Sequence, residues 1–234
     1  MIYRQRLSSM NLKKAFTLLE IVFVVVVIGI LSAIIAPRVK RATVQEAADQ
    51  IAAHIRYTQQ LALNDDKFKD NDSKWYQKRW QIVFSKSANT GNFWSYTIFS
   101  DQNGDDKPNK TIDKIAVNPN NPTKILSGGY SGTINYMNPE VTKEMVIGKK
   151  FGISNVTFSK SCSVNKSKRI FFDYLGRPMY GKTSSLQKKY FTSSTNTSLK
   201  YNRLIRSDCK ITITNGSETK VIVITPETGY VYIQ

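Results

Sequence analysis

One apolar run near the start of the chain limits its possible folds more than any other feature. Residues 16–36 contain a single charged side chain, Glu20. About 20 apolar residues in an α-helix, at roughly 1.5 Å each, match the thickness of a bilayer. The run therefore predicts a membrane-spanning helix.

The segment before this run is basic. Residues 1–15 hold no acid and four cations: Arg4, Arg6, Lys13 and Lys14. By the positive-inside rule this end stays in the cytoplasm. We therefore expect the rest of the chain on the other side of the membrane.

The run differs from a cleaved secretory signal in three ways. It is longer than a signal core, it contains Glu20, and no A-x-A pattern precedes Pro37. We expect it to remain part of the mature protein.

Residues 13–20, which read KKAFTLLE, resemble the prepilin peptidase site of type IV pilins and type II secretion pseudopilins. The resemblance implies cleavage between Ala15 and Phe16, with methylation of the new amine on Phe16. Ala15 stands where the family usually has Gly. Met10 is an alternative to Met1 as the start, and would shorten the leader to the family's usual length.

Glu20 has an expected role in assembly. A carboxylate in hydrocarbon costs roughly 2.5–3.5 kcal/mol, so it needs a partner. The amine of Phe16 on a neighbouring subunit is the partner that we expect, and this pairing would set the register between helices. The alternative is a carboxylate at the helix end that extends to the interface.

The helix is expected to continue beyond the apolar run as an amphipathic helix over residues 37–64. Its apolar residues recur at helical spacing. Gly29 and Pro37 are expected to weaken or kink the helix, because proline removes a hydrogen bond. The apolar side chains of the stripe are Val39, Ala42, Val44, Ala47, Ala48, Ile51, Ile55, Leu61 and Ala62.

Residues 65–234 predict a β-rich domain. Aromatic and β-branched residues alternate in short runs, and Asn215-Gly216 predicts a two-residue hairpin turn. Residues 118–150 and 182–202 are expected to be long loops. The fold class is therefore α+β, a long helix on an antiparallel sheet. The expected strands are 79–84, 94–99, 114–117, 124–126, 153–158, 170–174, 210–214, 220–225 and 230–233.

The last third of the chain resembles the GspH/FimT group of minor pilins and pseudopilins. The resemblance rests on Ile170–Pro178 with its Leu-Gly-Arg turn, on the hairpin runs 211–214 and 221–225, and on Thr228-Gly229 before a last strand. It implies an inner-membrane, single-pass subunit with a periplasmic domain, which enters a type II secretion pseudopilus or a type IV pilus. Other pilin subunits and prepilin peptidase would be its partners.

The exported part holds both cysteines of the chain, Cys162 and Cys209. An oxidising compartment favours a disulfide between them, and the alternative is two separate buried thiols.

The chain carries a formal net charge of +17, of which the four leader cations account for part. Such a charge attracts anionic partners, although a lysine-rich composition also simply solvates a surface.

Cations are dense between 160 and 210, with tyrosines among them, so a DNA-binding minor pilin of a natural-transformation pilus is the alternative function. Some FimT-type pilins bind DNA through Gly-Arg-x-Arg, where this chain reads Gly229-Tyr230-Val231-Tyr232. The expected DNA contacts are Lys166, Lys168, Arg169, Lys188, Lys189, Arg203 and Arg206.

No motif for catalysis, a cofactor or a metal is convincing. Residues 176–183 match the phosphate-loop pattern G-x-x-x-x-G-K-T, but Pro178 removes a backbone donor and a strand-connecting turn is favoured. Asp101, Asn103 and Asp105 have calcium-loop spacing without the glycine and glutamate of an EF-hand, so a solvated turn is favoured over a looser calcium site. His54 has no second metal-ligating histidine or cysteine near it in the sequence, so a metal site there has little support. We expect a non-enzyme.

Overall fold

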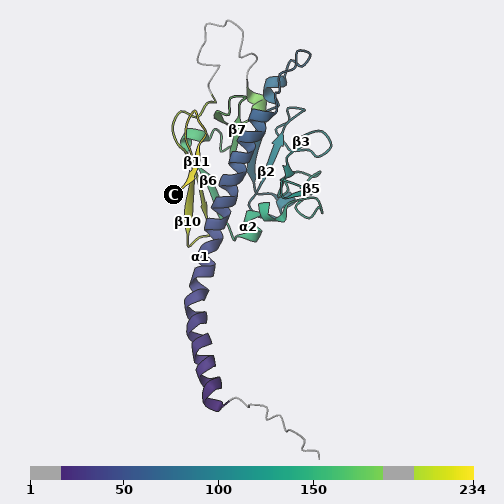
Figure 1. The fold of residues 1–234 in the computed structure, drawn as a ribbon. Coiled ribbons are helices and arrows are strands. Elements are labelled where there is room, and N and C mark those ends of the chain that lie inside the picture. The colour runs from purple at the N-terminus through teal and green to yellow at the C-terminus, as the bar shows by residue number, and fades with distance from the viewer. Residues whose placement is uncertain (1–16, 187–202) are drawn as a thin grey trace, which may run out of the picture. The chain divides into compact units, whose positions relative to one another are not determined.

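The computed structural model describes residues 17–186 and 203–234, with side-chain surroundings left out for 33–42. The chain forms two compact units, Met1–Arg41 and Ala42–Gln234. The helix α1, Leu18–Asn64, contributes to both (Figure 1). Each unit is described by itself below.

Helix α1 begins with a capped turn in the first unit. The side-chain oxygen of Thr17 accepts the backbone N–H of Glu20 at 3.3 Å, which satisfies one of the free N–H groups at the helix start. The spacing Thr17-x-x-Glu20 is that of a capping box, so the sequence itself carries a signal for a helix start at Thr17. Helical secondary structure continues through Gly29 and Pro37, and the kink expected there stays a prediction.

The expected membrane-spanning helix at 16–36 is wrong, and so is the single-pass inner-membrane location based on it. Within residues 17–186 and 203–234, no helix is both long and apolar enough to cross a membrane.

The second unit confirms the α+β class with antiparallel strands. Its first sheet has the order β3-β2-β1-β7-β8 and its second the order β11-β10-β9-β6, while β4 and β5 form a separate pair. The strands are β1 Trp80–Ser85, β2 Ser95–Ser100, β3 Lys114–Ile115, β4 Val117–Asn118, β5 Asn121–Ile125, β6 Asn155–Phe158, β7 Arg169–Phe172, β8 Pro178–Tyr180, β9 Cys209–Thr214, β10 Thr219–Ile224 and β11 Val231–Ile233.

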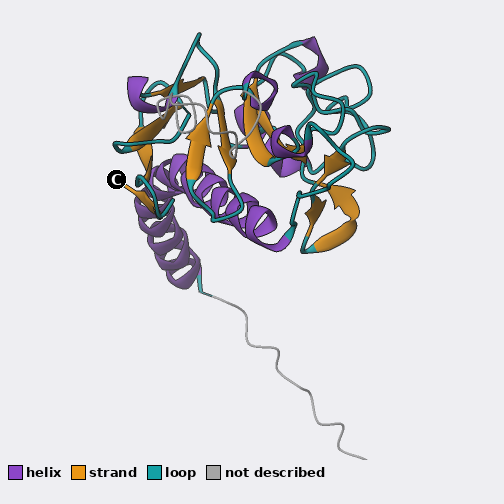
Figure 2. Ribbon diagram, turned by 90° about the horizontal axis from the view of Figure 1, so that it is seen from above, coloured by secondary structure: helices purple, strands orange, loops and turns teal. Residues whose placement is uncertain are grey.

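The part of α1 within the second unit lies across both sheets (Figure 2). Within its stripe, Val44, Ala48 and Ile51 are fully buried and belong to one core with residues of both sheets, such as Ile82 and Ile211. Burying each large aliphatic side chain contributes roughly 1.5–3 kcal/mol, so this stripe fixes the helix on the sheets.

A second, smaller core covers the other face of the first sheet. It contains Tyr76, Phe171, Met179 and Leu186. Phe171 points away from α1, whereas its neighbours Ile170 and Phe172 belong to the main core, as strand alternation requires.

The short helical elements lie in the connections. Helix α2, Ile147–Lys150, falls in a segment expected to be loop, because four residues are too few to show helical periodicity. The 3-10 helices are η1 Trp75–Gln77, η2 Ala88–Thr90, η3 Lys143–Met145, η4 Lys160–Cys162 and η5 Thr183–Ser185.

The β9–β10 hairpin forms as expected, but its loop is longer than two residues. Thr214 pairs with Thr219, which leaves four residues in the loop. The side-chain oxygen of Asn215 accepts the backbone N–H groups of Ser217 and Glu218 at 3.0 and 2.8 Å. These bonds stabilise the wider turn in place of a tight Asn-Gly one.

Candidate functional site

The first candidate site is the apolar half of α1, residues 18–32. Its large side chains are exposed all around the helix, from 36% for Val27 to 82% for Leu18. Glu20 lies among them, exposed and in the first turn, where a negative charge is favourable next to the helix dipole. Ala15 and Phe16, the predicted processing residues, lie outside the described residues.

The disulfide between Cys162 and Cys209 is confirmed. The two Cα atoms lie 5.4 Å apart, and both residues are completely buried. The bond joins η4 to the first residue of β9, so it holds a loop of the domain against the second sheet.

The cations expected to contact DNA have different surroundings. Lys166 and Arg206 are exposed, and the ammonium of Lys168 lies 5.3 Å from the Trp94 ring centroid. The guanidinium of Arg203 donates to the Ser185 hydroxyl at 3.1 Å. Lys188 and Lys189 lie outside the described residues.

Arg169 cannot serve as a surface contact, because it is only 3% exposed. Its guanidinium donates to the side-chain oxygen of Gln81 at 2.8 Å and to the backbone oxygen of Asp106 at 2.7 Å. It also lies 3.6 Å from the Asp106 carboxylate. The high density of cations around it in the sequence gave no sign of this internal role.

The phosphate-loop pattern does not form a phosphate loop. It is divided between strand β8 and the three-residue helix η5, whereas phosphate binding needs a loop that opens an α-helix. Lys182 lies 3.7 Å from the buried carboxylate of Asp106, which also accepts hydrogen bonds from Ser184. These residues hold the chain's own loop in place.

The acidic turn brings Asp101, Asp105 and Asp113 together, with one carboxylate oxygen of each within 4.8 Å of the others. Asp101 accepts two backbone N–H groups at 2.7 and 2.8 Å, and Asp113 likewise accepts two, at 2.7 and 2.8 Å. Burial raises the pKa of both carboxyls. The two buried carboxylates therefore serve to close the loop.

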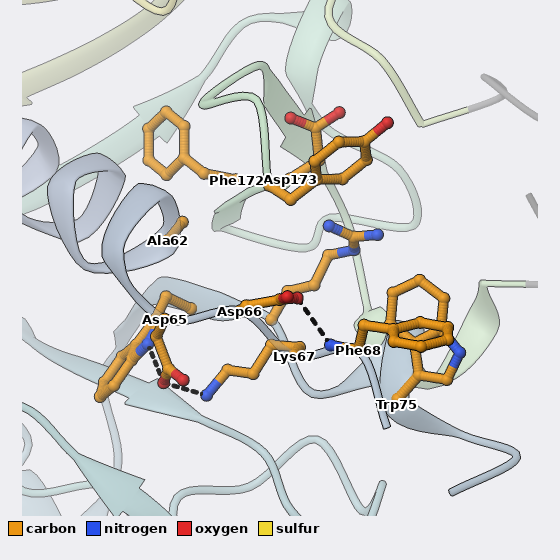
Figure 3. Close-up of a pocket in the computed structure, with 11 residues that line it drawn as sticks. Ala62, Asp65, Asp66, Lys67, Phe68, Trp75, Phe172 and Asp173 are labelled. Atoms are coloured by element: carbon orange, nitrogen blue, oxygen red, sulfur yellow. Dashed lines mark hydrogen bonds and ion pairs between the residues drawn. The ribbon is translucent and has the colours of Figure 1, made fainter. Parts of the chain in front are cut away.

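A pocket of about 250 Å³ lies beside the C-terminal end of α1 in the second unit (Figure 3). Three segments form it: the end of α1 with the residues after it, η1 with the start of β1, and the end of β7. Its walls combine five aromatic side chains with two cations and three acids. The lining residues are Ala62, Asp65, Asp66, Lys67, Phe68, Trp75, Arg79, Trp80, Phe172, Asp173 and Tyr174.

Internal partners hold most of the charged groups of this pocket. Asp65 accepts hydrogen bonds from the Trp80 indole at 2.9 Å and from Lys67 (Figure 3). Burial raises the pKa of Asp65, but these two bonds, together with the positive charges of Lys67 and Lys114, outweigh it and leave the pKa below its ordinary value. Asp173 is bonded to Arg177 at 2.7 Å. None of the described lining residues is a Ser, Thr, Cys or His.

The comparisons with known proteins gave no match, whether to a family model, a curated protein or a solved structure.

Proposed function

We propose that this chain is a structural subunit of a type IV pilin-like filament, a minor pilin or pseudopilin that assembles through the apolar half of α1. The observation that carries the proposal is the exposure of apolar side chains on every side of that half. A helix that is apolar all around is stable only when other groups cover it.

Other copies of the same kind of helix provide that cover. Each Val, Leu or Ile side chain that a neighbouring helix buries contributes roughly 1.5–3 kcal/mol. All eight residues from 21 to 28 are exposed Val, Ile or Phe, which is enough to drive a helical bundle.

Glu20 gives the bundle its register. It is the single charged residue between 16 and 36, so in a dry bundle its carboxylate requires a cation. After cleavage behind Ala15, the amine of Phe16 on the neighbouring copy supplies one. The Thr17 cap holds the first turn in helical form, so the carboxylate projects from a defined position.

Processing is tested by co-expression of the full chain with a prepilin peptidase, followed by intact-mass analysis. The expected product is residues 16–234 with one added methyl group. Ala15→Leu is the matched control, because a bulky residue before the cut blocks cleavage. A wild-type chain that stays uncleaved would contradict the proposal.

Burial of the apolar half is tested by cysteine cross-linking. Val22→Cys, in the apolar run, is expected to cross-link copies only in assembled filaments, whereas Thr111→Cys, on the domain surface, is the control. Equal cross-linking of both variants, or cross-linking of Val22→Cys without filaments, would argue against a helical bundle.

A further inference from the structure

Met137 is the most exposed large hydrophobic side chain among the described residues of the second unit, at 72%. It lies in a turn that Asn135 closes. The side-chain oxygen of Asn135 accepts the N–H of Met137 at 3.0 Å, and its backbone oxygen accepts the N–H of Asn138 at 3.0 Å. The turn therefore holds an apolar side chain at the surface, and methionine is flexible enough to adapt to apolar groups of different shapes.

Tight packing fixes the base of this turn. The backbone N–H of Tyr136 donates to the carbonyl oxygen of Asn89 at 2.9 Å. A Cβ atom at Gly91, which has φ +65°, would lie 2.8 Å from the Tyr136 ring, so the packing requires glycine there. Lys143 donates to the backbone oxygens of Tyr136 and Asn138 at 2.7 and 3.2 Å. The turn is thus preorganised, which lowers the entropy cost of binding a partner.

A second segment, residues 143–150, faces the turn (α2 in Figure 1). Its sequence KEMVIGKK has an apolar centre, residues 145–147, which are at most 2% exposed. This centre anchors η3 and α2 on the domain, and Lys149 and Lys150 stay exposed. The ammonium of Lys149 lies 5.8 Å from the centroid of the Tyr136 ring, so the two segments meet across a short gap.

Between the two segments lies a hollow of about 470 Å³. Three lysines line it together with three apolar or aromatic residues, and none of its described lining residues is acidic. Glu140, close to the turn in the sequence, is paired with Lys110 at 2.5 Å, so this acid is committed elsewhere. The lining residues are Tyr136, Met137, Lys143, Val146, Lys149 and Lys150.

We propose that this hollow binds an acidic segment of a partner protein. One apolar side chain of the segment contacts Met137, and carboxylates on either side of it pair with Lys149 and Lys150. Charge complementarity supports this occupant, because the chain has six lysines and one acid, Glu144, between residues 143 and 168. A single exposed ion pair contributes little, so the affinity requires several carboxylates and the apolar contact together.

Two other occupants fit less well. A second copy of this chain carries the same formal net charge of +17, which repels it. Single-stranded nucleic acid gains affinity by stacking bases on open rings, whereas Lys149 lies beside the one ring that lines the hollow. The hollow is outside the apolar half of α1, so this proposal and the filament function can each fail without the other.

The probe is a fluorescein-labelled peptide of sequence EEELEEE, titrated with the purified full chain in mild detergent and followed by fluorescence anisotropy. Binding is expected at about 50 mM salt and should weaken as added salt screens the charges. EEEGEEE has the same charge without the apolar side chain, and is expected to bind about fivefold more weakly because no leucine is buried. Equal binding of the two peptides, or no binding of EEELEEE at low salt, would overturn the proposal.

Variants of the hollow separate the two contacts. Lys149→Gln/Lys150→Gln is expected to weaken the binding of both peptides by about fivefold, because two charge pairs are lost. Met137→Ser is expected to weaken EEELEEE by about fivefold and to leave EEEGEEE unchanged, since the leucine and Met137 act as a coupled pair. Equal losses for both peptides in Met137→Ser would contradict the assigned contact.

The matched control is Lys69→Gln/Lys74→Gln, which removes the same charge from exposed lysines elsewhere. Circular dichroism melting curves are used to confirm that each variant is folded. An equal loss in the control pair would overturn the proposal, since binding would then follow net charge alone. An oligothymidylate of the same charge as EEELEEE is the competing anion, and tighter binding of it that Lys149→Gln/Lys150→Gln abolishes would overturn the proposal as well.

Discussion

The side-chain nitrogen of Gln59 lies 2.7 Å from the carbonyl oxygen of Gly176, and so joins α1 to the turn after β7. The same nitrogen donates to the carbonyl oxygen of Thr228 at 2.8 Å, in the turn before β11. The Leu-Gly-Arg and Thr-Gly turns singled out in the sequence therefore meet at one side chain of the helix.

Replacement of Gln59 tests this junction. Gln59→Ala removes both hydrogen bonds and is expected to lower the free energy of unfolding by about 1–3 kcal/mol, at about 0.5–1.5 kcal/mol for each bond. Urea unfolding measures the change. Gln60→Ala, at the exposed neighbouring position, is the control and should change the free energy by less than about 0.5 kcal/mol; equal effects would show that the junction contributes nothing.

Reduction of the disulfide is expected to destabilise the domain. The bond closes a sequence separation of 47 residues, for which loss of chain entropy in the unfolded state predicts a contribution of about 2–4 kcal/mol. A lower urea midpoint in reductant is the expected result. The Cys162→Ala/Cys209→Ala variant should have the low midpoint with and without reductant, and an unchanged wild-type midpoint would contradict the prediction.

Acid is expected to destabilise the fold through His54. Burial lowers its pKa from 6.5 to about 4, and its Nδ1 lies 2.7 Å from the Tyr96 hydroxyl, which also accepts a hydrogen bond from Gln50 at 2.7 Å. Because the unfolded chain binds the proton more tightly, stability is complete above pH 6.5 and falls as the pH drops toward 4, by about 2–3 kcal/mol.

The pH dependence is measured by urea unfolding between pH 7 and pH 4.5, with His54→Gln as the reference. The pKa values of the buried carboxyls Asp101 and Asp113 are raised, so these two groups favour the folded state as the pH falls. They are present in both the wild type and His54→Gln, so the comparison isolates His54. If wild type and His54→Gln lose stability in parallel, His54 is not the group responsible.

Arg169 is expected to be a folding residue. Arg169→Gln leaves the Asp106 carboxylate, 5% exposed, without its buried cation. Breaking such a pair costs about 3–5 kcal/mol, which chemical denaturation would detect. Arg206→Gln removes an exposed arginine and should be nearly neutral. Similar stabilities of the two variants would disprove the structural role of Arg169.

Local patterns in the sequence predicted much of the second unit. The alternation in residues 94–99 and 210–214 located β2 and β9 within one residue, because strand periodicity depends on which face is buried. Strand β8 was missed, since it has three residues and begins with Pro178, which reads as a turn. Helix α2 was missed because of its length.

The candidate sites were harder to predict, because they depend on contacts between distant residues. The sequence indicated Cys162 and Cys209 as a pair, since two cysteines allow one pairing. It could not show that Arg169 turns inward to Asp106, 63 positions away, or that Tyr136 lies against Gly91. Hydropathy predicted a membrane-spanning helix, but no helix among the described residues is long and apolar enough to be one.

Glu20→Gln tests the central claim, that a charge on this helix sets the register of a filament. Glutamine replaces glutamate in a capping box, so the Thr17 cap and the helix start should persist, but it cannot form an ion pair with an amine. Filament assembly of the processed chain would be measured by electron microscopy and sedimentation, with Glu46→Gln, exposed on the same helix, as control. The account predicts normal filaments for Glu46→Gln and none for Glu20→Gln; normal filaments from Glu20→Gln would contradict it.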